Sequence, residues 1–282
     1  MKLLVILCGL LLCYACQPQN RNTQPRTRSI TDALGRKVVL QDSIQRIVCI
    51  RASAIRLVTY AGGVPFICGV EEQECRPNEY THILAHPELA RKPIIGPSMG
   101  GDAELILTVC PDVIFMSATT VEDADALQTR TNIPVFTIEY GDLHRNRPCF
   151  YQSLRKIAQV LHTERHTDSL IRFIDEQIAE LRQRTTSSTH APKTYVGGIS
   201  YRGQKGITST DPYYAAFQFI GADNVASCID STYISPINGT YIDREQLFEW
   251  DPEIIFIDTG GLPLVKEDLR KQKKLNSLLS AY

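Results

Sequence analysis

The sequence predicts an α/β protein with two similar lobes, each with a parallel sheet, and one long helix between them. Three observations support this fold class. Segment 102–117 recurs without a gap as segment 243–258. Strand and helix patterns alternate on both sides of the middle of the chain, as in a sheet covered by helices. Between them, residues 150–190 carry no strand signal.

Each copy of the repeat has the pattern of a short helix followed by a strand. A glutamate, Glu104 or Glu245, stands in the first helical turn, where a negative charge suits the helix dipole. A proline, Pro111 or Pro252, cannot continue the helix. The unbroken apolar run after it is typical of a parallel strand buried on both faces. The repeat therefore predicts a duplicated unit with one glutamate on a short helix of each lobe.

Residues 1–16 have the pattern of an export signal. Lys2 precedes the apolar run 3–12, which is too short to span a bilayer as a stable anchor, and the small residue Ala15 precedes Cys16. Ala15 and Cys16 also resemble the lipobox of bacterial lipoproteins, which implies that Cys16 is lipidated. We therefore expect an exported protein anchored in a membrane, on the periplasmic side or at the cell surface. The polar residues 17–29 predict a flexible tether.

Composition limits the class of protein further. A chain of 282 residues is long enough for two domains with buried cores. Its net charge of -1 gives no reason to expect nucleic acid or an anionic membrane surface as a partner. The six cysteines after Cys16 show no zinc spacing, and export leaves their pairing open. Cys49 lies in an apolar run and is predicted to be a buried small hydrophobe.

The first lobe is predicted to comprise residues 30–148. It begins with a hairpin at 30–40, whose turn contains Asp32 and Gly35. Strands are expected at 46–50, 67–70 and 134–138, besides the strand of the repeat. Helices are expected from Ser53 to Tyr60 and over about 123–130.

Residues 149–190 are predicted to be an inter-lobe helical segment. Thr163 is expected to cap a helix that runs to about Arg184. Such a rod is roughly 30 Å long, about the diameter of a small domain. One face of it is apolar: Leu170, Ile171, Ile174, Ile178 and Leu181. The second lobe, 191–282, then opens with a strand at 194–199 and contains the second copy of the repeat.

With these elements in order, the chain resembles the substrate-binding proteins of bacterial ABC importers for ferric siderophores, haem and vitamin B12. The resemblance extends from about residue 30 to the end and rests on a series of short motifs: Asp32-x-x-Gly35-Arg36, Arg46-Ile47-Val48, Gly69-Val70, Glu104 with Pro111-Asp112, Ile133-Pro134, the inter-lobe helix, and Glu245 with Pro252. It implies two Rossmann-like lobes bridged by one long helix, a ligand held between them and a small hinge motion.

The resemblance also implies partners. In that family one glutamate of each lobe docks on arginines of the permease, and Glu104 and Glu245 stand at those places, as a two-point electrostatic key. No cofactor is implied, since a ferric chelate, haem or corrinoid is the cargo. We expect a monomer. Family members continue past the helix that here ends near Tyr282, so the second lobe is expected to be shortened at its C-terminus.

Ligand residues are expected in the loops that leave the carboxyl ends of parallel strands. Arginines there pair with anionic groups, and tyrosines offer a flat apolar surface with a polar tip. The rule nominates Arg51, Ser53, Ser98, Met99, Ser117, Tyr140, Tyr201, Arg202, Tyr213 and Thr259.

Three other readings of the chain stay open. One is direct metal binding by His82 with His86 or by His162 with His166, although the spacing is equally that of exposed histidines, which we favour. Another is an exported hydrolase that uses Ser200 or a cleft histidine. No set of acid, base and nucleophile stands out by its spacing, so we expect no enzyme and no catalytic residue. The third is a surface receptor without a permease.

Overall fold

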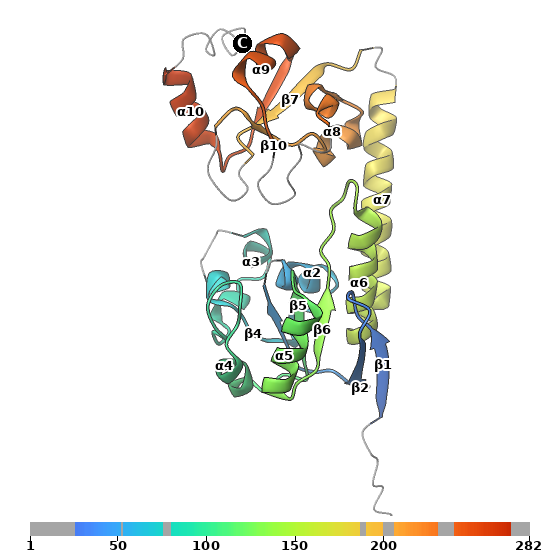
Figure 1. Cartoon of the computed structure of the whole chain (residues 1–282). Helices are drawn as coiled ribbons and strands as arrows, with labels where there is room; N and C mark the ends of the chain where they lie inside the picture. Colours follow the sequence, from blue (N-terminus) through green and yellow to red (C-terminus); the bar gives the residue numbers. More distant parts are fainter. Residues whose placement is uncertain are drawn as a thin grey trace, which may run out of the picture.

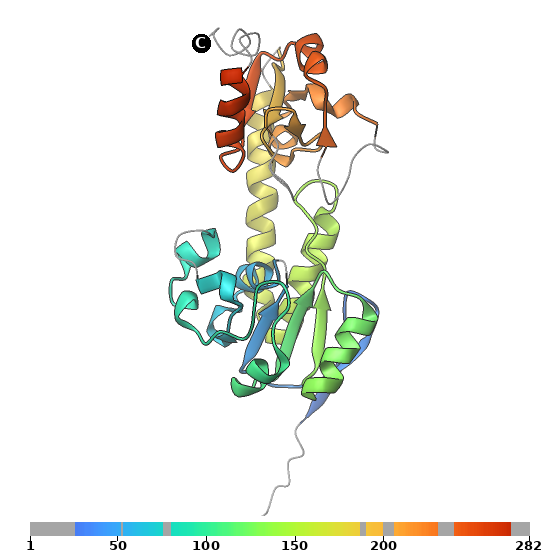
Figure 2. The ribbon, with the colours of Figure 1, turned by 60° about the vertical axis from the view of Figure 1, so that its left-hand side comes forward.

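A computed structural model of the chain describes residues 26–51, 53–75, 80–186, 190–199, 206–230 and 240–271. Two lobes lie along one long helix, α7 (Glu164–Thr186), the N-lobe around its lower half and the C-lobe at its upper end (Figure 1). The view turned by 60° shows the same helix running from one lobe to the other (Figure 2). The predicted fold class, two α/β lobes with parallel sheets bridged by one long helix, is confirmed.

The N-lobe contains a four-stranded parallel sheet in the order β4-β3-β5-β6. Its strands are β3 (Ile47–Ile50), β4 (Ile67–Gly69), β5 (Val113–Ser117) and β6 (Val135–Ile138). Every residue of β3, β5 and β6 is buried. This is the burial that unbroken apolar runs predict for strands covered on both faces.

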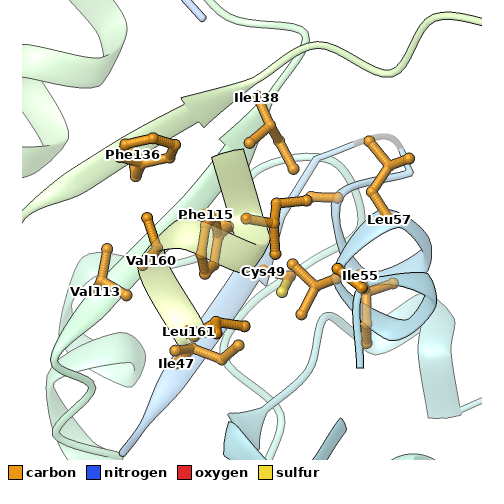
Figure 3. Close-up of a cluster of buried hydrophobic side chains, with 14 of the residues drawn as sticks. Ile47, Cys49, Ile55, Leu57, Val113, Phe115, Phe136, Ile138, Val160 and Leu161 are labelled. Carbon is orange, nitrogen blue, oxygen red and sulfur yellow. The ribbon is translucent and has the colours of Figure 1, made fainter. Parts of the chain in front are cut away.

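Helices cover both faces of this sheet. One face packs against α2 (Ala54–Tyr60) and α6 (Arg147–Leu161), and the other against α4 (Ala103–Thr108) and α5 (Val121–Thr131). Figure 3 shows the first face, where Phe115 and Phe136 lie with Leu57 and Leu161. Cys49 is 3% exposed in this cluster, so its prediction as a buried hydrophobe is confirmed. Short helical segments complete the lobe: η1 (Val64–Phe66), η2 (Glu72–Cys75), α3 (Thr81–Ala85) and η3 (Leu89–Arg91).

The predicted hairpin is confirmed as β1 (Thr27–Thr31) paired with β2 (Lys37–Gln41). Its turn is held by the carboxylate of Asp32, which accepts hydrogen bonds from the backbone N–H groups of Leu34 (3.1 Å) and Arg36 (2.9 Å). Gly35 has φ 81°, a left-handed conformation that glycine adopts without a steric penalty. The turn also contacts β6, since the N–H of Ala33 donates to the carbonyl of Thr137 at 3.0 Å.

The central segment forms two helices, α6 and α7. α6 packs into the N-lobe core, whereas α7 continues beyond it, and its buried residues include Ile171 and Ile178 from the predicted apolar face. The predicted helix to about Arg184 is thereby confirmed. The predicted cap is wrong, because the hydroxyl of Thr163 has no hydrogen-bond partner among the described residues. Its backbone carbonyl instead accepts from the N–H of Thr167.

The C-lobe has a smaller parallel sheet in the order β11-β7-β9. Its strands are β7 (Lys193–Gly197), β9 (Asp223–Asn224) and β11 (Ile254–Ile257), and a separate antiparallel pair joins β8 (Ser209–Thr210) to β10 (Thr240–Tyr241). The helical segments are α8 (Ala215–Ile220), η4 (Val225–Cys228), α9 (Arg244–Trp250) and α10 (Leu262–Lys271). The core gathers around Tyr195, Leu247 and Val265.

The second copy of the repeat differs from the first in its burial. β5 is fully buried, but in β11 Ile254 is 37% and Phe256 45% exposed. The prediction of a strand buried on both faces is therefore wrong for β11. The reason is its place in the sheet, since among the described strands β11 lies at an edge and pairs only with β7.

Candidate functional site

The carboxyl ends of the N-lobe strands face the C-lobe. β5 and β6 point toward it in Figure 1, so the loops that follow them, and the loop after β3, lie at the end of the N-lobe that faces the C-lobe. Four non-glycine residues near this edge have left-handed backbone: Arg51 (φ 70°), Ser53 (φ 64°), Met99 (φ 68°) and Ala118 (φ 47°). Strained backbone of this kind persists only where its surroundings hold it, and it concentrates at functional sites.

The side chain of Arg51 braces two of these loops. Its Nη1 donates to the carbonyl of Ala118 at 3.0 Å, and its Nη2 lies 3.0 Å from the carboxylate of Asp123. The guanidinium thus links the loop after β3 to the loop after β5. Arg51 stands at the predicted place, but its charge is already paired within the N-lobe.

A buried carboxylate, Glu71, joins the same edge to the segment before α4. Glu71 is 2% exposed. Its oxygens accept from the backbone N–H of Arg51 at 3.1 Å and of Gly100 at 2.9 Å. Burial raises the pKa of Glu71, while these backbone hydrogen bonds act in the opposite direction. Sequence reasoning missed this residue because an acid in a polar loop carries no sign of burial.

The other nominated residues of the N-lobe differ in how much they expose. Met99 is 43% and Tyr140 is 42% exposed, and Ser98 is also exposed, so all three offer surface to a ligand. Ser117 is fully buried within β5. The hydroxyl of Ser53 accepts from Nη2 of Arg56 at 3.2 Å. The structure therefore gathers Arg51, Ser53, Met99 and Ser117 around one sheet edge, with Ser117 beneath the surface.

On the C-lobe side, Tyr213 is half-buried and Thr259 exposed. Thr259 follows β11, at the carboxyl end of the C-lobe sheet. Tyr201, Arg202 and Ser200 lie outside the described residues.

The loop after β6 meets the C-lobe at a seam that the sequence did not reveal. The guanidinium of Arg145 lies 4.1 Å from the ring centre of Tyr213, and the ring of His144 lies 5.7 Å from it. Both ring nitrogens of His144 are buried without a hydrogen-bond partner among the described residues. Burial therefore lowers the pKa of His144, against the opposing charges of Asp142 and Asp211. The carboxyl-end rule identified this loop at Tyr140, and it would have found the seam had it been carried four residues further.

The two repeat glutamates are both exposed and lie in different lobes. Glu104 is in α4, where Asp102 caps the helix by accepting from the N–H groups of Glu104 and Leu105 at 2.9 and 3.0 Å. Glu245 is in α9, beside an open hollow of about 760 Å³. In Figure 1 α4 lies in the lower lobe and α9 in the upper, both on the same side of α7.

The histidines paired in the sequence do not meet around a metal site. His82 is 7% exposed, and its Nε2 lies 2.6 Å from the carboxylate of Glu74, so the expectation of an exposed histidine is wrong there. His162 and His166 each contact a backbone carbonyl, that of Asp42 at 2.9 Å and that of Tyr60 at 3.1 Å. Within the described part of the chain, no group of three or more His, Cys, Asp or Glu side chains is placed to hold a metal ion.

Two further observations bear on the environment of the protein. All six described cysteines are free thiols. A search of the described residues finds no helix that combines the length and apolar character needed to cross a membrane. Cys16 and the export pattern lie outside those residues.

Comparison with known proteins decides the family. A family model described as periplasmic binding protein matches residues 47–282. The chain belongs to this family. Among curated relatives, the molybdate-binding protein MolA of Haemophilus influenzae is 22% identical to this periplasmic binding protein over 264 residues, which is 87% of this chain and 72% of MolA.

Solved structures show the same fold. A periplasmic solute binding protein from Veillonella parvula has a TM-score of 0.64 at 18% identity and covers 83% of this chain and 69% of its own. The petrobactin-binding protein YclQ of Bacillus subtilis has a TM-score of 0.65 at 13% identity, over 91% and 88% of the two chains. The expected resemblance to binding proteins of bacterial ABC importers is thus confirmed. Each of these relatives is described as a binding protein.

Proposed function

We propose that this periplasmic binding protein captures an organic metal chelate between its two lobes and delivers it to an ABC permease. The exposed surfaces of Met99 and Tyr140, at the carboxyl edge of the N-lobe sheet, carry this proposal. Exposed large apolar and aromatic side chains on the end of one lobe that faces the other suit a ligand with ring surfaces, such as a ferric catecholate siderophore, haem or cobalamin. A bare oxoanion would need mainly hydrogen-bond donors in their place.

One cation at the seam, Arg145, also favours an anionic chelate. Arg145 is exposed and rests on the face of Tyr213, so it can turn toward a negative ligand group without breaking an ion pair recorded among the described residues. Arg51, by contrast, is paired with Asp123 and acts as a brace. The ligand would therefore meet an aromatic and apolar N-lobe edge with its charge toward the seam.

A thermal-shift screen of the exported form, begun at Cys16, tests the cargo. The probes are a ferric catecholate siderophore, haem, cobalamin and molybdate, the last because the relative MolA is named for it. Ligand at a hundred times its dissociation constant adds about 2.7 kcal/mol, which raises the melting midpoint by roughly 5 to 10 °C. A shift with molybdate alone would identify the cargo as an oxoanion and reject the chelate. A shift with none of the four would reject these cargoes.

Docking on the permease is proposed for Glu104 and Glu245. Both are exposed glutamates on rigid helices of different lobes, which suits recognition of two separated basic groups. Glu104→Lys and Glu245→Lys should abolish uptake of the cargo by cells and leave ligand affinity unchanged. Glu176→Lys, an exposed glutamate of α7, is the matched control and should transport normally. A fall in affinity that matched the loss of uptake would reject the docking role.

Anchoring through Cys16 is proposed from the sequence pattern alone. Cells given a labelled fatty acid should label the wild-type protein and not Cys16→Ser, which should be released from the membrane fraction. Equal labelling of both proteins would reject lipidation at Cys16 and would not affect the proposed binding function.

A hydrolase on the same scaffold is the weaker alternative. Such an enzyme needs a base in hydrogen-bond reach of its nucleophile. No set of acid, base and nucleophile stands out by its spacing in the sequence. Turnover of a substrate that is lost in Ser200→Ala would reverse this preference.

A further inference from the structure

Glu71 occupies an unusual place for a carboxylate. It follows Val70, which bridges to Ile94 at the end of β4, and its side chain is 2% exposed. Ionisable side chains are rarely buried to this extent unless hydrogen bonds compensate for the lost water. Neither docking nor the contacts proposed above for the ligand explain why an acid is kept there.

The contacts of Glu71 all lead to the two loops at the sheet edge. Oε2 accepts from the N–H of Arg51 at 3.1 Å, and Oε1 accepts from the N–H of Gly100 at 2.9 Å. The backbone of Met99 also lowers the pKa of Glu71, and Nε2 of Gln73 lies 3.4 Å from Oε2. One carboxylate thus joins Arg51, directly after β3, to loop 98–101.

Both loops need such a support. Arg51 and Met99 have φ of 70° and 68°, in the left-handed region that side chains other than glycine rarely adopt. A backbone N–H that donates to a buried carboxylate is fixed in direction as well as position. Met99, which exposes 43% of its surface, is therefore presented at this sheet edge by a backbone that Glu71 holds.

We propose that Glu71 is a positioning residue of the ligand site, whose carboxylate holds the backbone at Arg51 and loop 98–101 in the conformation that the cargo meets. The part of this proposal that concerns cargo rests on the proposed function. The part that concerns the loops does not.

Amide hydrogen exchange of the ligand-free protein, followed by NMR, tests the loops. Glu71→Gln has nearly the same shape, but its NH₂ group faces a backbone N–H where an oxygen did. In this variant the exchange rate of at least one of the amides of Arg51, Met99 and Gly100 should rise about tenfold or more. In Glu71→Ala all three rates should rise by about tenfold or more. Glu74→Gln is the matched control, since Glu74 is also buried but pairs with His82 at 2.6 Å. It should leave the three amides unchanged.

The outcomes separate the two claims. Wild-type exchange at these amides in both Glu71 variants would overturn the proposal. Circular dichroism checks that each variant is folded, and Glu71→Gln keeps the test available if Glu71→Ala is not. With the ferric catecholate probe, Glu71→Gln should raise the dissociation constant about tenfold or more, and Glu74→Gln should not.

If wild-type protein binds no probe, the proposed cargo fails while the exchange data still decide the role of Glu71 in the loops. If the loops loosen and affinity stays unchanged, Glu71 does not position the ligand site. If affinity falls while exchange stays at the wild-type rate, Glu71 acts by its charge and the positioning role is again rejected.

Discussion

Replacing Asp32 by alanine should destabilise the N-lobe strongly. Asp32 is 1% exposed, and its carboxylate accepts from the N–H groups of Leu34 (3.1 Å), Arg36 (2.9 Å) and Thr137 (3.3 Å). It also lies 3.5 Å from Nε of Arg36. The alanine variant leaves three donors and a guanidinium without their common acceptor. Loss of one partner of a buried charged pair costs about 3 to 5 kcal/mol, and unsatisfied buried donors alone cost about 1 to 3 kcal/mol each.

The expected loss of stability lies at the lower end of the sum for the three unsatisfied donors, because Arg36 keeps two other partners. Its Nη2 donates to the carbonyl of Val135 at 2.5 Å, and its Nε lies 3.4 Å from Asp125. We therefore expect a loss of about 3 to 5 kcal/mol in the free energy of unfolding. Asp32→Asn, which keeps one carbonyl oxygen as an acceptor, should lose less.

Urea denaturation with two probes measures this loss and locates it. Far-UV circular dichroism samples both lobes, whereas the chain has a single tryptophan, Trp250, in α9 of the C-lobe. The circular dichroism transition should move more than the tryptophan transition. Asp42→Ala is the control from the end of the same hairpin, because Asp42 is 54% exposed and pairs with Arg28 at 3.8 Å, a contact of at most about 1 kcal/mol. If Asp32→Ala cost no more than Asp42→Ala, the assigned role of the carboxylate would be refuted.

Three further predictions concern the seam, the C-lobe and the helix pair. Because burial lowers the pKa of His144, the unfolded chain binds its proton more readily, so this contribution to stability is complete above about pH 6.5 and is lost as the pH falls through the folded pKa. Wild-type urea midpoints should thus fall relative to His144→Gln between pH 7.5 and pH 5.5, and parallel curves would contradict this. Gly261→Ala places a Cβ 2.0 Å from the carbonyl oxygen of Gly198, so Trp250 fluorescence should report a loss of about 1 to 3 kcal/mol. Gly100→Ala, where nothing lies within 4 Å of the added carbon, should leave the free energy of unfolding unchanged. Tyr151→Phe removes the hydrogen bond from the phenol to Asp175 at 2.7 Å between α6 and α7 and should cost about 1 kcal/mol by circular dichroism. Burial raises the pKa of Tyr151 to about 12, so the phenol signal that is lost in Tyr151→Phe should ionise well above pH 10 in an ultraviolet titration; ionisation near pH 10 would disprove the buried bond.

Local patterns in the sequence predicted most of the fold. The hairpin follows from the turn residues Asp32 and Gly35, whose preferences act over four residues. The helix after Thr163 follows from its apolar spacing. Both depend on neighbours within one or two turns of the chain, which a single sequence displays.

Failures arose where the partner is distant in sequence. Burial of β11 was overestimated because exposure of Phe256 depends on which strands lie beside it. The spacing of the histidines gave no sign that His82 is buried and pairs with Glu74. The two copies of the repeat also differ in capping: the Asp102 carboxylate accepts two backbone hydrogen bonds, whereas the Asp243 side chain makes no cap.

The candidate site was predicted by position rather than by contact. The carboxyl-end rule placed Met99 and Tyr140 at an exposed edge, but it could not see that Arg51 is paired with Asp123. Glu71 gave no signal, because an acid in a polar loop looks the same whether buried or solvated, and His144 lies four residues beyond Tyr140, where the rule was applied. Both residues were identified only from the three-dimensional structure.

The length of α7 determines the rotation of one lobe relative to the other as well as the distance between them. With 23 residues it is about 34 Å long, and each residue also turns the chain by about 100° around the helix axis. Removal of two residues would rotate the C-lobe by about 200° while bringing it only about 3 Å nearer, and α9 would then point away from the side on which α4 lies. Removal of seven would shorten the rod by about 10 Å yet change the rotation by only about 20°. The number of residues in this helix therefore sets the phase between the lobes, much as the number of base pairs between two operator half-sites does on DNA.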